Sequence, residues 1–516
     1  MPDVSCLSGT TSEQWRFKWP LLIPNVREYT CEPTRRVTIR DGVAVEVSCP
    51  DAAAPDWVSK KIKAWFRATP AMRTGPEGGG SRSRATVEDA QKRVPPGDEA
   101  FALSTKDGTL RIGANKMQGA RWAMMTLRQI AQPARGTFRT EAYEVPEFSV
   151  RDWPDTPFRA LHVCAFPEYS PVRIERAIRL AAYYKFNHVI LESWGVFRSK
   201  RHPWHGWRDG WLTPTECRRL AALASDLGVT LVPFFNAFGH ATAARAKSGK
   251  NAILDVLPEY QPLFEPVEGF NWCVSNPEAR RVIRDLVDEL HEAFGRPAFF
   301  HLGCDEADPP SCALCCAPGY GARVAEHVRS MAEFVRSLGA RPMIWHDMLL
   351  RSGSEKWRGL EANGSDETVA LLDALPKDVI VCDWHYGPAS SGGLHAASLD
   401  HFISHGFDTM TCPWDDLGGI DAQCGFARQR GLGVICTTWN HLVTYDTPRF
   451  LSYAAACAWG AHAAEGIKAA DARSNCTVRF VFSSHWRQVG WDTPGADRYS
   501  ECGFLSNQVS TSIGER

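Results

Sequence analysis

Eight short runs rich in apolar and β-branched residues recur along the chain, and segments with helical spacing of apolar residues separate several of them. The runs are residues 159–165, 187–193, 229–236, 298–303, 341–347, 378–384, 407–412 and 432–439. Strands that alternate with helices form parallel sheets, because each helix returns the chain to the same edge of the sheet. Eight units are typical of a (β/α)8 barrel, so the sequence predicts an α/β fold with a TIM barrel.

An open, doubly wound sheet is the alternative, but no glycine-rich phosphate fingerprint follows the first run. Residues 240–276 read as a long insertion after the third predicted strand. In a barrel, the loop after a strand lies on the face that carries the active site. The barrel is therefore the favoured fold, with this insertion near its site.

The first 150 residues predict a small α+β domain ahead of the barrel. Residues 37–49 and 101–114 alternate apolar and polar side chains around Asp-Gly pairs, so each is predicted to form a β-hairpin. Residues 118–131 have helical spacing, and residues 75–84 are Gly- and Ser-rich and predict a loop. The expected domains are an N-terminal domain at 1–150, a catalytic barrel at 151–462, and an extension at 463–516 that packs on the barrel or mediates assembly.

Charge and composition narrow the classes of partner. The 58 basic residues nearly balance the 59 acidic ones, so nothing predicts binding to nucleic acid or to an anionic membrane surface. No apolar run reaches the ~18 residues that a membrane span requires. No secretory signal is visible, and the odd count of 17 cysteines suits reduced thiols, so we expect a cytoplasmic protein. The sequence does not decide whether the protein forms a homo-oligomer.

Carboxylates, histidines and tryptophans gather where the predicted strands end. In a barrel these ends meet at one face, so the side chains are expected to surround one pocket. Indole rings suit the flat faces of sugars, although most of the 19 tryptophans are expected in the core. The pattern predicts a polar pocket with aromatic walls that holds a sugar ring.

The segment HLGCDEA at 301–307 ends the fourth run with Asp305 and Glu306. Retaining glycosidases commonly place two carboxyl groups about 5 Å apart, and inverting ones roughly 6.5–9.5 Å apart, across the scissile bond. Adjacent residues at one strand end do not easily straddle a bond. A consistent solution is that Glu306 acts as the general acid while a 2-acetamido group of the substrate attacks C1, oriented by Asp305. The charge of Asp305 would raise the pKa of Glu306.

HLGCDEA resembles the signature of family 20 glycoside hydrolases, the β-N-acetylhexosaminidases, and with RPMIWHDML at 341–349 it resembles the hexosaminidase D branch most. Residues 118–131, FRALHV at 158–163 and VPFFNAFGH at 232–240 are similar to further segments of that family. The resemblance implies an exo-acting, retaining enzyme that removes terminal β-linked GlcNAc or GalNAc from a glycan. No cofactor and no catalytic metal are expected.

The resemblance also implies roles for single residues. Glu306 would be the general acid and base, Asp305 would orient the acetamido group, and Tyr386 would hydrogen-bond its carbonyl. Arg159 would bind sugar hydroxyls. The remaining expected site residues wall or support the pocket: Trp345, Trp384, Trp439, His240 and His301. Val163-Cys164-Ala165 and Glu192-Ser193-Trp194 depart from the family pattern at the first two strand ends, which leaves the preferred sugar open.

Four cysteines follow the acid pair with the spacing C-x7-C-x2-C-C, namely Cys304, Cys312, Cys315 and Cys316. Cys312 and Cys315 have the spacing of metal ligands, and Cys304 or Cys316 could add a third thiolate. No matching second pair follows nearby, so unpaired thiols are the favoured interpretation and a structural zinc ion is the alternative.

Two other classes of function stay open. A glycan-binding barrel without turnover is disfavoured, because a lectin needs no acid such as Glu306. A metal-dependent barrel hydrolase would use His240, His301 and the acidic strand ends, but the dense His-x-His spacing of such sites is missing. Sensitivity to a chelator would separate it from the first hypothesis.

Overall fold

A computed structural model describes residues 22–73, 94–134, 142–167, 169–206, 210–242, 253–266, 269–387, 393–439 and 448–465. The described residues form two compact units, one of residues 22–154 with 462–465 and one of residues 155–461, the barrel unit. The Gly- and Ser-rich loop at 75–84 and most of the predicted extension, residues 466–516, lie outside the described residues. Within them, no helix combines the length and apolar composition of a membrane span.

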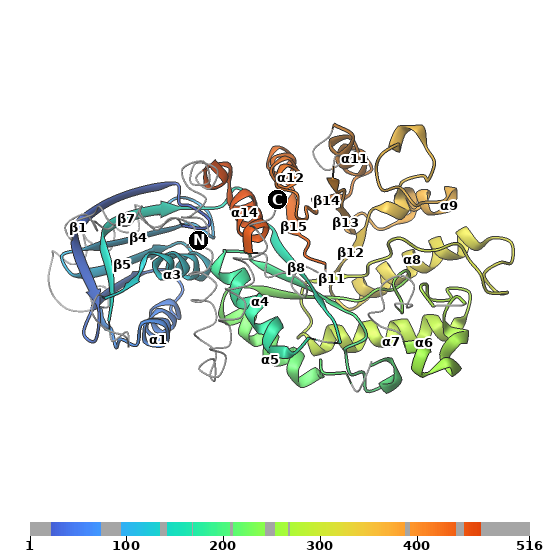
Figure 1. Ribbon diagram of the computed structural model, residues 1–516, viewed down its shortest axis with the longest axis horizontal. Helices are drawn as coiled ribbons and strands as arrows, with labels where there is room; N and C mark the ends of the chain where they lie inside the picture. Colours follow the sequence, from blue (N-terminus) through green and yellow to red (C-terminus); the bar gives the residue numbers. More distant parts are fainter. Residues whose placement is uncertain are drawn as a thin grey trace, which may run out of the picture. The chain divides into compact units, whose positions relative to one another are not determined.

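The N-terminal unit is a seven-stranded sheet in the order β1-β7-β4-β5-β2-β3, with β6 paired to β7. Helices α1 and α3 pack side by side against β2, β4 and β5 (Figure 1). Trp122, Met125 and Ile130 of α3 are buried, as their spacing predicts. The predicted α+β domain is confirmed. Its elements are β1 Glu28–Ile39, β2 Ala44–Ser48, α1 Ala54–Phe66, β3 Ala71–Arg73, β4 Phe101–Lys106, β5 Thr109–Ala114, α3 Met117–Ile130, β6 Gln132–Pro133 and β7 Tyr143–Asp152.

One of the two predicted hairpins forms. Strands β4 and β5 pair antiparallel across Asp107 and Gly108, which both take positive φ angles (51° and 71°), as a two-residue hairpin turn requires. The hairpin predicted at residues 37–49 is wrong, because β1 pairs with β7 while β2 lies between β5 and β3. Its Asp-Gly turn instead binds the segment before β3, where Thr69 N donates to Asp41 Oδ1 and Gly42 N donates to Thr69 O.

The barrel unit contains a closed barrel of eight strands in the order β10-β11-β12-β13-β14-β15-β8-β9, and every pair is parallel (Figure 1). Each strand coincides with one of the eight predicted runs, so the TIM barrel is confirmed. The strands are β8 Arg159–Ala165, β9 His188–Ser193, β10 Thr230–Phe234, β11 Phe299–His301, β12 Arg341–Trp345, β13 Ile380–Asp383, β14 Asp408–Thr411 and β15 Gly433–Cys436.

Helices connect these strands, and local sequence signals set where several of them begin. Thr213, Asn276 and Asp416 accept backbone N–H groups of the first turn, and Pro214 and Pro277 follow two of these caps. The α-helices are α4 Pro171–Tyr183, α5 Pro214–Asp226, α6 Ile253–Val256, α7 Pro277–Ala293, α8 Tyr320–Ser337, α9 Asp366–Val369, α10 Leu371–Ala374, α11 Gly393–Ser404, α12 Leu417–Arg430 and α14 Pro448–Trp459. The 3₁₀ helices are η2 Pro203–His205, η4 Pro258–Leu263, η5 Asp347–Leu349 and η6 Glu355–Trp357.

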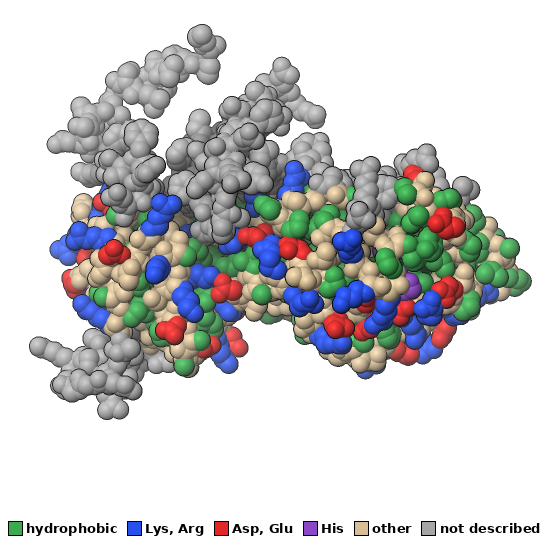
Figure 2. Space-filling model, turned by 90° about the horizontal axis from the view of Figure 1, so that it is seen from below, with side chains coloured by type: hydrophobic (Ala, Val, Ile, Leu, Met, Phe, Trp, Pro, Cys, Tyr) green, Lys and Arg blue, Asp and Glu red, His purple; other side chains and the backbone are tan. Residues whose placement is uncertain are grey.

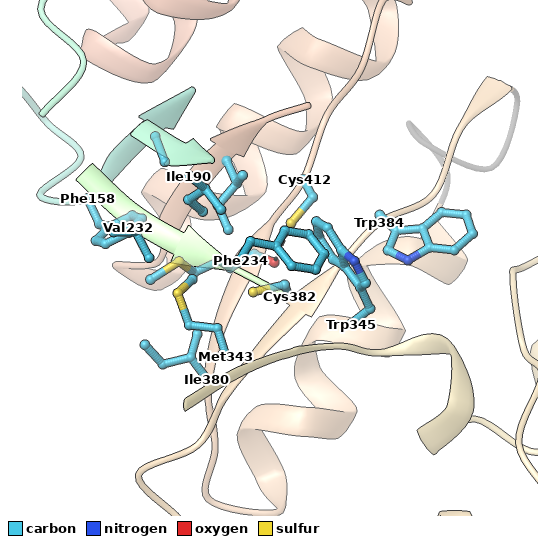
Figure 3. Packing of buried hydrophobic residues seen from close by; sticks show 13 residues of the cluster. Phe158, Ile190, Val232, Phe234, Met343, Trp345, Ile380, Cys382, Trp384 and Cys412 are labelled. Carbon is cyan, nitrogen blue, oxygen red and sulfur yellow. Dashed lines mark hydrogen bonds between the residues drawn. The ribbon is translucent and has the colours of Figure 1, made fainter. Parts of the chain in front are cut away.

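The barrel interior is filled with side chains at alternate strand positions. Figure 3 shows Phe158, Val232 and Met343 toward one end of this core and Trp345 and Trp384 toward the other. Because successive strand residues point to opposite faces, the inward positions continue past the strand ends toward the barrel mouth. The core is therefore continuous with any site at the carboxyl ends of the strands. On the face that Figure 2 shows, basic and acidic side chains are interspersed.

Candidate active site

The acid pair, Asp305 and Glu306, follows β11 at the carboxyl end of the barrel. The chain turns sharply here, with φ of 65° at Gly303, 71° at Cys304 and 45° at Glu306. Left-handed conformations at non-glycine residues are strained and are common at functional sites. A side chain at Gly303 would collide with the amide oxygen of Asn236, so glycine is needed there for packing as well as conformation.

His240 joins the two carboxylates of the acid pair. Its Nε2 lies 3.4 Å from Asp305 Oδ2 and 3.3 Å from Glu306 Oε2. Asp305 is buried, whereas the side chain of Glu306 is 48% exposed and can be reached by a ligand. The ring of His240 meets Phe270 edge to face, which holds the imidazole in place. Both carboxylates thus converge on one point from adjacent residues.

The electrostatics of this trio follow from burial and charge. Burial lowers the pKa of His240, but the carboxylates around it, Asp305 foremost, outweigh burial and raise that pKa to about 10. Burial raises the pKa of Asp305, and the charge of His240 opposes that rise. We take the histidinium–carboxylate form at neutral pH, because it gives both buried groups an oppositely charged partner.

Asp347 supports Glu306 from below, a role that the sequence did not indicate. Its buried carboxylate accepts the backbone N–H of Glu306 at 2.9 Å and the amide of Asn363 at 2.9 Å. Burial and the charge of Asp305 raise the pKa of Asp347 to about 7. Its position along the chain could have indicated this place, because Asp347 lies two residues after the inward-facing Trp345 and so shares its direction.

A second buried network lies beside the trio, built from β8, β9 and the end of β10. His162 Nε2 lies 3.0 Å from Glu192 Oε2, and Asn236 Nδ2 donates to Glu192 Oε1 at 2.7 Å. Although burial favours the neutral acid, His162 and Asn236 lower the pKa of Glu192 to about 2. His162 was not singled out from the sequence, yet it lies two residues after the inward-facing Ala160 and so shares its direction.

Aromatic side chains from β12, β13 and β15 line the other part of the barrel mouth. Trp439 Nε1 donates to Tyr386 Oη at 2.9 Å, and Trp384 stacks on Tyr386 with centroids 5.2 Å apart. Trp345 is 1% exposed, and its ring lies 5.9 Å from that of Trp439. Burial holds the pKa of Tyr386 well above its ordinary value, so its hydroxyl is a neutral donor.

Several buried polar atoms around this mouth have no hydrogen-bond partner within the described part of the chain. They include the acceptors Asp305 Oδ1 and Asn236 Oδ1 and the donors Trp345 Nε1 and Trp384 Nε1. Buried polar atoms are rarely left unsatisfied, so such a group marks a place where a ligand could supply the missing bonds. The arrangement suits a ligand with both donors and acceptors and an apolar face.

Arg159, expected to bind sugar hydroxyls, does not lie at this site. It is the first residue of β8, and the six residues up to Ala165 span about 20 Å of strand. Its buried guanidinium donates to the carbonyls of Thr156 and Lys185 and lies over the ring of Trp459. The prediction is wrong because Arg159 lies at the amino end of its strand.

His301 lies beneath the pocket. Its ring stacks on Phe234 at 4.2 Å and lies 4.4 Å from the ring of Trp345, while Nδ1 accepts the backbone N–H of Gly303. Burial holds its pKa well below its ordinary value, so the ring is neutral. The structure therefore places His301 against the aromatic floor and the turn before the acid pair.

His346, Asp383 and His385 also lie at the ends of β12 and β13, but they form a separate buried cluster. Asp383 Oδ1 lies 3.0 Å from His385 Nε2 and 3.6 Å from His346 Nε2. His346 Nδ1 accepts the backbone N–H of Trp384. These residues alternate with the inward-facing Trp345, Trp384 and Tyr386, so the cluster holds the aromatic wall from behind.

A (β/α)8 barrel with an acid pair at one strand end agrees with the comparisons with known proteins. Residues 20–153 match the description "Glycosyl hydrolase family 20, domain 2", and residues 181–415 match "Glycosyl hydrolase family 20, catalytic domain". The chain therefore belongs to glycosyl hydrolase family 20. The narrower hexosaminidase D branch stays a prediction.

Similar proteins are known by sequence and by structure. The Beta-hexosaminidase of Vibrio furnissii is 24% identical over 357 residues, which cover 60% of this chain and 54% of that protein. The Beta-N-acetylhexosaminidase of Cellulomonas fimi is 27% identical over 233 residues, covering 41% and 45%. The chain thus spans about half the length of these curated relatives. The solved beta-N-acetylhexosaminidase of Streptomyces coelicolor A3(2) shares the fold, with a TM-score of 0.63 at 16% identity over 92% of this chain and 97% of that one.

Proposed function

We propose that this protein is an exo-acting, retaining β-N-acetylhexosaminidase that removes terminal β-linked GlcNAc or GalNAc from a glycan. The observation that carries the proposal is the acid pair, which converges with His240 at the carboxyl end of β11 beside the aromatic wall. The printed names of the relatives, beta-hexosaminidases, support the same activity.

The geometry favours a nucleophile that belongs to the substrate. Asp305 and Glu306 are adjacent residues, and both carboxylates contact the same atom, His240 Nε2, at 3.4 and 3.3 Å, so both acids approach from one side. The other buried carboxylates nearby are already engaged, Glu192 by His162 and Asn236, and Asp347 by the backbone of Glu306. A 2-acetamido group supplies the missing nucleophile, as in substrate-assisted glycosidases of this family.

In the first step the acetamido carbonyl oxygen attacks C1 as the bond from C1 to the leaving oxygen breaks. Glu306 donates its proton to that oxygen, and Asp305 accepts the acetamido N–H, which increases the electron density on the carbonyl. The products are an oxazolinium ion and a free alcohol. In the second step the Glu306 carboxylate takes a proton from water, water attacks C1, and the acetamido group is regenerated with retained configuration.

The aromatic side chains position the sugar for these steps. Tyr386 can donate its hydroxyl hydrogen to the acetamido carbonyl oxygen, because burial keeps that hydroxyl protonated. Trp384 and Trp439 offer flat faces for the ring and its acetamido methyl group, and the buried Trp345 packs against Trp439. Stacking of this kind does not distinguish the C4 configuration, so both GlcNAc and GalNAc fit the proposal.

The test is release of nitrophenol from the β-N-acetylglucosaminide, the β-N-acetylgalactosaminide and the plain β-glucoside. We expect turnover of the acetamido sugars alone and slower turnover when trifluoroacetamido replaces acetamido, because its carbonyl is a weaker nucleophile. A stable bicyclic thiazoline analogue of the oxazolinium ion should inhibit competitively. Equal turnover of the β-glucoside would contradict the mechanism.

The two rival functions predict other outcomes. A glycan-binding protein without turnover would bind the acetamido sugars and release no nitrophenol from any of them. A metal-dependent hydrolase would lose its activity at once on brief exposure to a chelator and regain it when metal is added.

A further inference from the structure

Four potential metal ligands converge in the barrel unit outside the acid pair and its network. Glu265 and Cys273 come from the insertion between β10 and α7, whereas Cys312 and Cys315 come from the loop between β11 and α8. One ligand atom of each lies within 4.8 Å of all the others. We call these four residues the cysteine cluster.

The spacing within the cysteine cluster is that of a tetrahedral site. Zinc–sulfur bonds of about 2.3 Å place two sulfur atoms about 3.8 Å apart in a tetrahedron, and a zinc–oxygen bond of about 2.0 Å places sulfur and oxygen about 3.5 Å apart. The sulfur atom of Cys273 lies 3.5 Å from that of Cys312 and 3.6 Å from that of Cys315. Cys312 Sγ lies 3.3 Å from Glu265 Oε1.

The surroundings of the cluster suit anionic ligands. Glu265 Oε2 accepts the backbone N–H groups of Ser311 and Cys312, both at 2.8 Å, so the carboxylate is fixed and Oε1 stays directed at the sulfur atoms. Cys312 Sγ accepts the backbone N–H of Cys315 at 3.2 Å. Hydrogen bonds of this kind orient the side chains that bind a metal ion and stabilise their thiolate form.

Burial and a nearby cation complete the site. Cys273, Cys315 and Glu265 are 1%, 0% and 4% exposed. The guanidinium of Arg323 donates to the carbonyl of Cys315 at 3.1 Å and to Ser275 Oγ at 2.8 Å, and Cys315 Sγ donates to the same hydroxyl. Three thiolates and a carboxylate around a divalent ion leave net negative charge, which this cation offsets.

We propose that Glu265, Cys273, Cys312 and Cys315 bind one zinc ion with a structural role. Thiolate-rich tetrahedral sites select zinc among the common divalent ions, and four protein ligands leave no open position for catalysis. This proposal does not depend on the proposed function.

Cys312 and Cys315 are the pair that the sequence suggested, but the other two ligands are not Cys304 or Cys316. Cys304 Sγ is directed at the carbonyl of Leu302, and Cys316 is exposed with its sulfur near the carbonyl of Pro310. Glu265 and Cys273 take their places from the insertion, which lies about forty residues earlier in the chain than Cys312 and Cys315. No local spacing connects these two segments, so only the fold brings them together.

The proposed ion would fasten the insertion to the loop that carries the acid pair. Direct bonds already join the two, because Asn271 Nδ2 donates to the carbonyl of Asp308 at 2.7 Å and Asp308 N donates to Asn271 Oδ1 at 3.1 Å. Phe270 of the insertion contacts the ring of His240. The site would therefore brace both sides of the acid pair.

The experiment measures zinc per chain by mass spectrometry of the full-length protein, purified without chelator from zinc-supplemented medium. We expect about one zinc ion per chain in the wild type and in Cys316→Ser, the matched control beside Cys315. Cys273→Ser and Cys312→Ser should each retain less than a tenth of that amount. A zinc-free wild type, or equal zinc in Cys273→Ser, would overturn the proposal.

A second measurement uses only the wild type, in case the variants do not fold. Native alkylation followed by peptide mass spectrometry should label Cys316 quickly, and should label Cys273, Cys312 and Cys315 only after zinc is removed. A disulfide among these three cysteines in freshly purified protein would contradict the proposal. Because zinc content and thiol protection are read directly, a missing hexosaminidase activity would affect the proposed function alone.

Discussion

The two sides of the barrel mouth are built from different kinds of side chain. The charged half, at the ends of β8 to β11, carries titratable groups in buried networks, among them His162, Glu192, His240 and the acid pair. The aromatic half, at the ends of β12 to β15, carries Trp345, Trp384, Tyr386 and Trp439, whose polar atoms are indole and hydroxyl groups, while the charged cluster of His346, Asp383 and His385 lies behind them.

The two halves of the barrel mouth divide two tasks between them. Buried charges are costly, and the charged half retains them through pairing, because an unpaired buried carboxylate would take up a proton instead. The four aromatic side chains carry no charge, so they need no such pairing and provide shape and apolar surface. We therefore expect changes in the charged half to affect bond breaking and pH dependence, and changes in the aromatic half to affect mainly the fit of the sugar.

The largest effect is expected for Glu306→Gln. Without a general acid, kcat/KM should fall about 10²–10⁴-fold for alkyl or disaccharide substrates with poor leaving groups. Nitrophenyl substrates need little protonation, so their first step should lose far less. Steady-state kinetics on both substrates provide the measurement, and equal losses on both would remove Glu306 from this role.

Asp305→Asn should reduce kcat for both classes of leaving group. The amide cannot accept the acetamido N–H as a carboxylate does, so the nucleophile loses orientation and electron density, and a loss of about 10²–10³-fold is expected. The ratio between the two substrates should stay near that of the wild type. A ratio shifted as in Glu306→Gln would show that the two acids share one task.

Tyr386→Phe tests the aromatic half. We expect kcat/KM to fall about 10–100-fold, which is the value of one hydrogen bond to a group that becomes charged. Thr437→Val is the matched control, because Thr437 Oγ1 is the second neighbour of the Tyr386 hydroxyl at 3.3 Å. It should cost much less. If both variants lose equally, Tyr386 acts through the orientation of its ring and not through a bond to substrate.

His240→Gln should change the pH dependence of stability, the smallest expected effect. The pKa of His240 is about 10 in the folded protein and about 6.5 in an unfolded chain. The folded state holds the extra proton between these values, so this stabilisation is complete below pH ~6.5 and is lost as the pH rises toward 10. Wild-type free energy of unfolding should therefore fall more steeply from pH 6 to 9.5 than that of the variant.

Urea unfolding of both proteins across this range provides the measurement. His327→Gln is the control, because burial lowers the pKa of His327 to about 4 and the ring is neutral throughout the range. This variant should keep the wild-type slope even if it is less stable. A wild-type slope in His240→Gln would contradict the histidinium between the two carboxylates.

Most of the barrel could be predicted from the sequence, because strands buried on both faces read as apolar runs and the helices between them have clear periodicity. The hairpin at residues 37–49 could not, because an Asp-Gly turn indicates a reversal of the chain but not the partner of each strand. Long β1 pairs with β7, more than a hundred residues later. That choice depends on tertiary packing, which local alternation does not encode.

Residues of the candidate site could be predicted where a reactive side chain stands at the end of a predicted strand. They were missed where only the inward or outward direction of the side chain along its strand pointed to the site. Asp305, Glu306 and Tyr386 carry recognisable chemistry at strand ends. Arg159 also carries suitable chemistry, but it lies at the start of its strand, so position should have excluded it. To place His162 and Asp347 in the site, one must know that Ala160 and Trp345 point into the barrel. Only the closed barrel shows which strand residues point inward.

Gly239 gives the molecule a property that matters for how its specificity can change. A side chain there would run into the carbonyl of Asp305, so the chain entering the insertion is held directly against the acid pair. At the other end of the insertion, Asn271 is tied to Asp308. Between these two anchors lie His240, which contacts both carboxylates, Phe270, which packs on its ring, and the proposed zinc ligand Glu265, so any exchange of the insertion would have to keep these three residues. We expect that exchanging the part of the insertion before Glu265, with His240 kept, would change which glycans the proposed enzyme accepts while the acid pair stays in place.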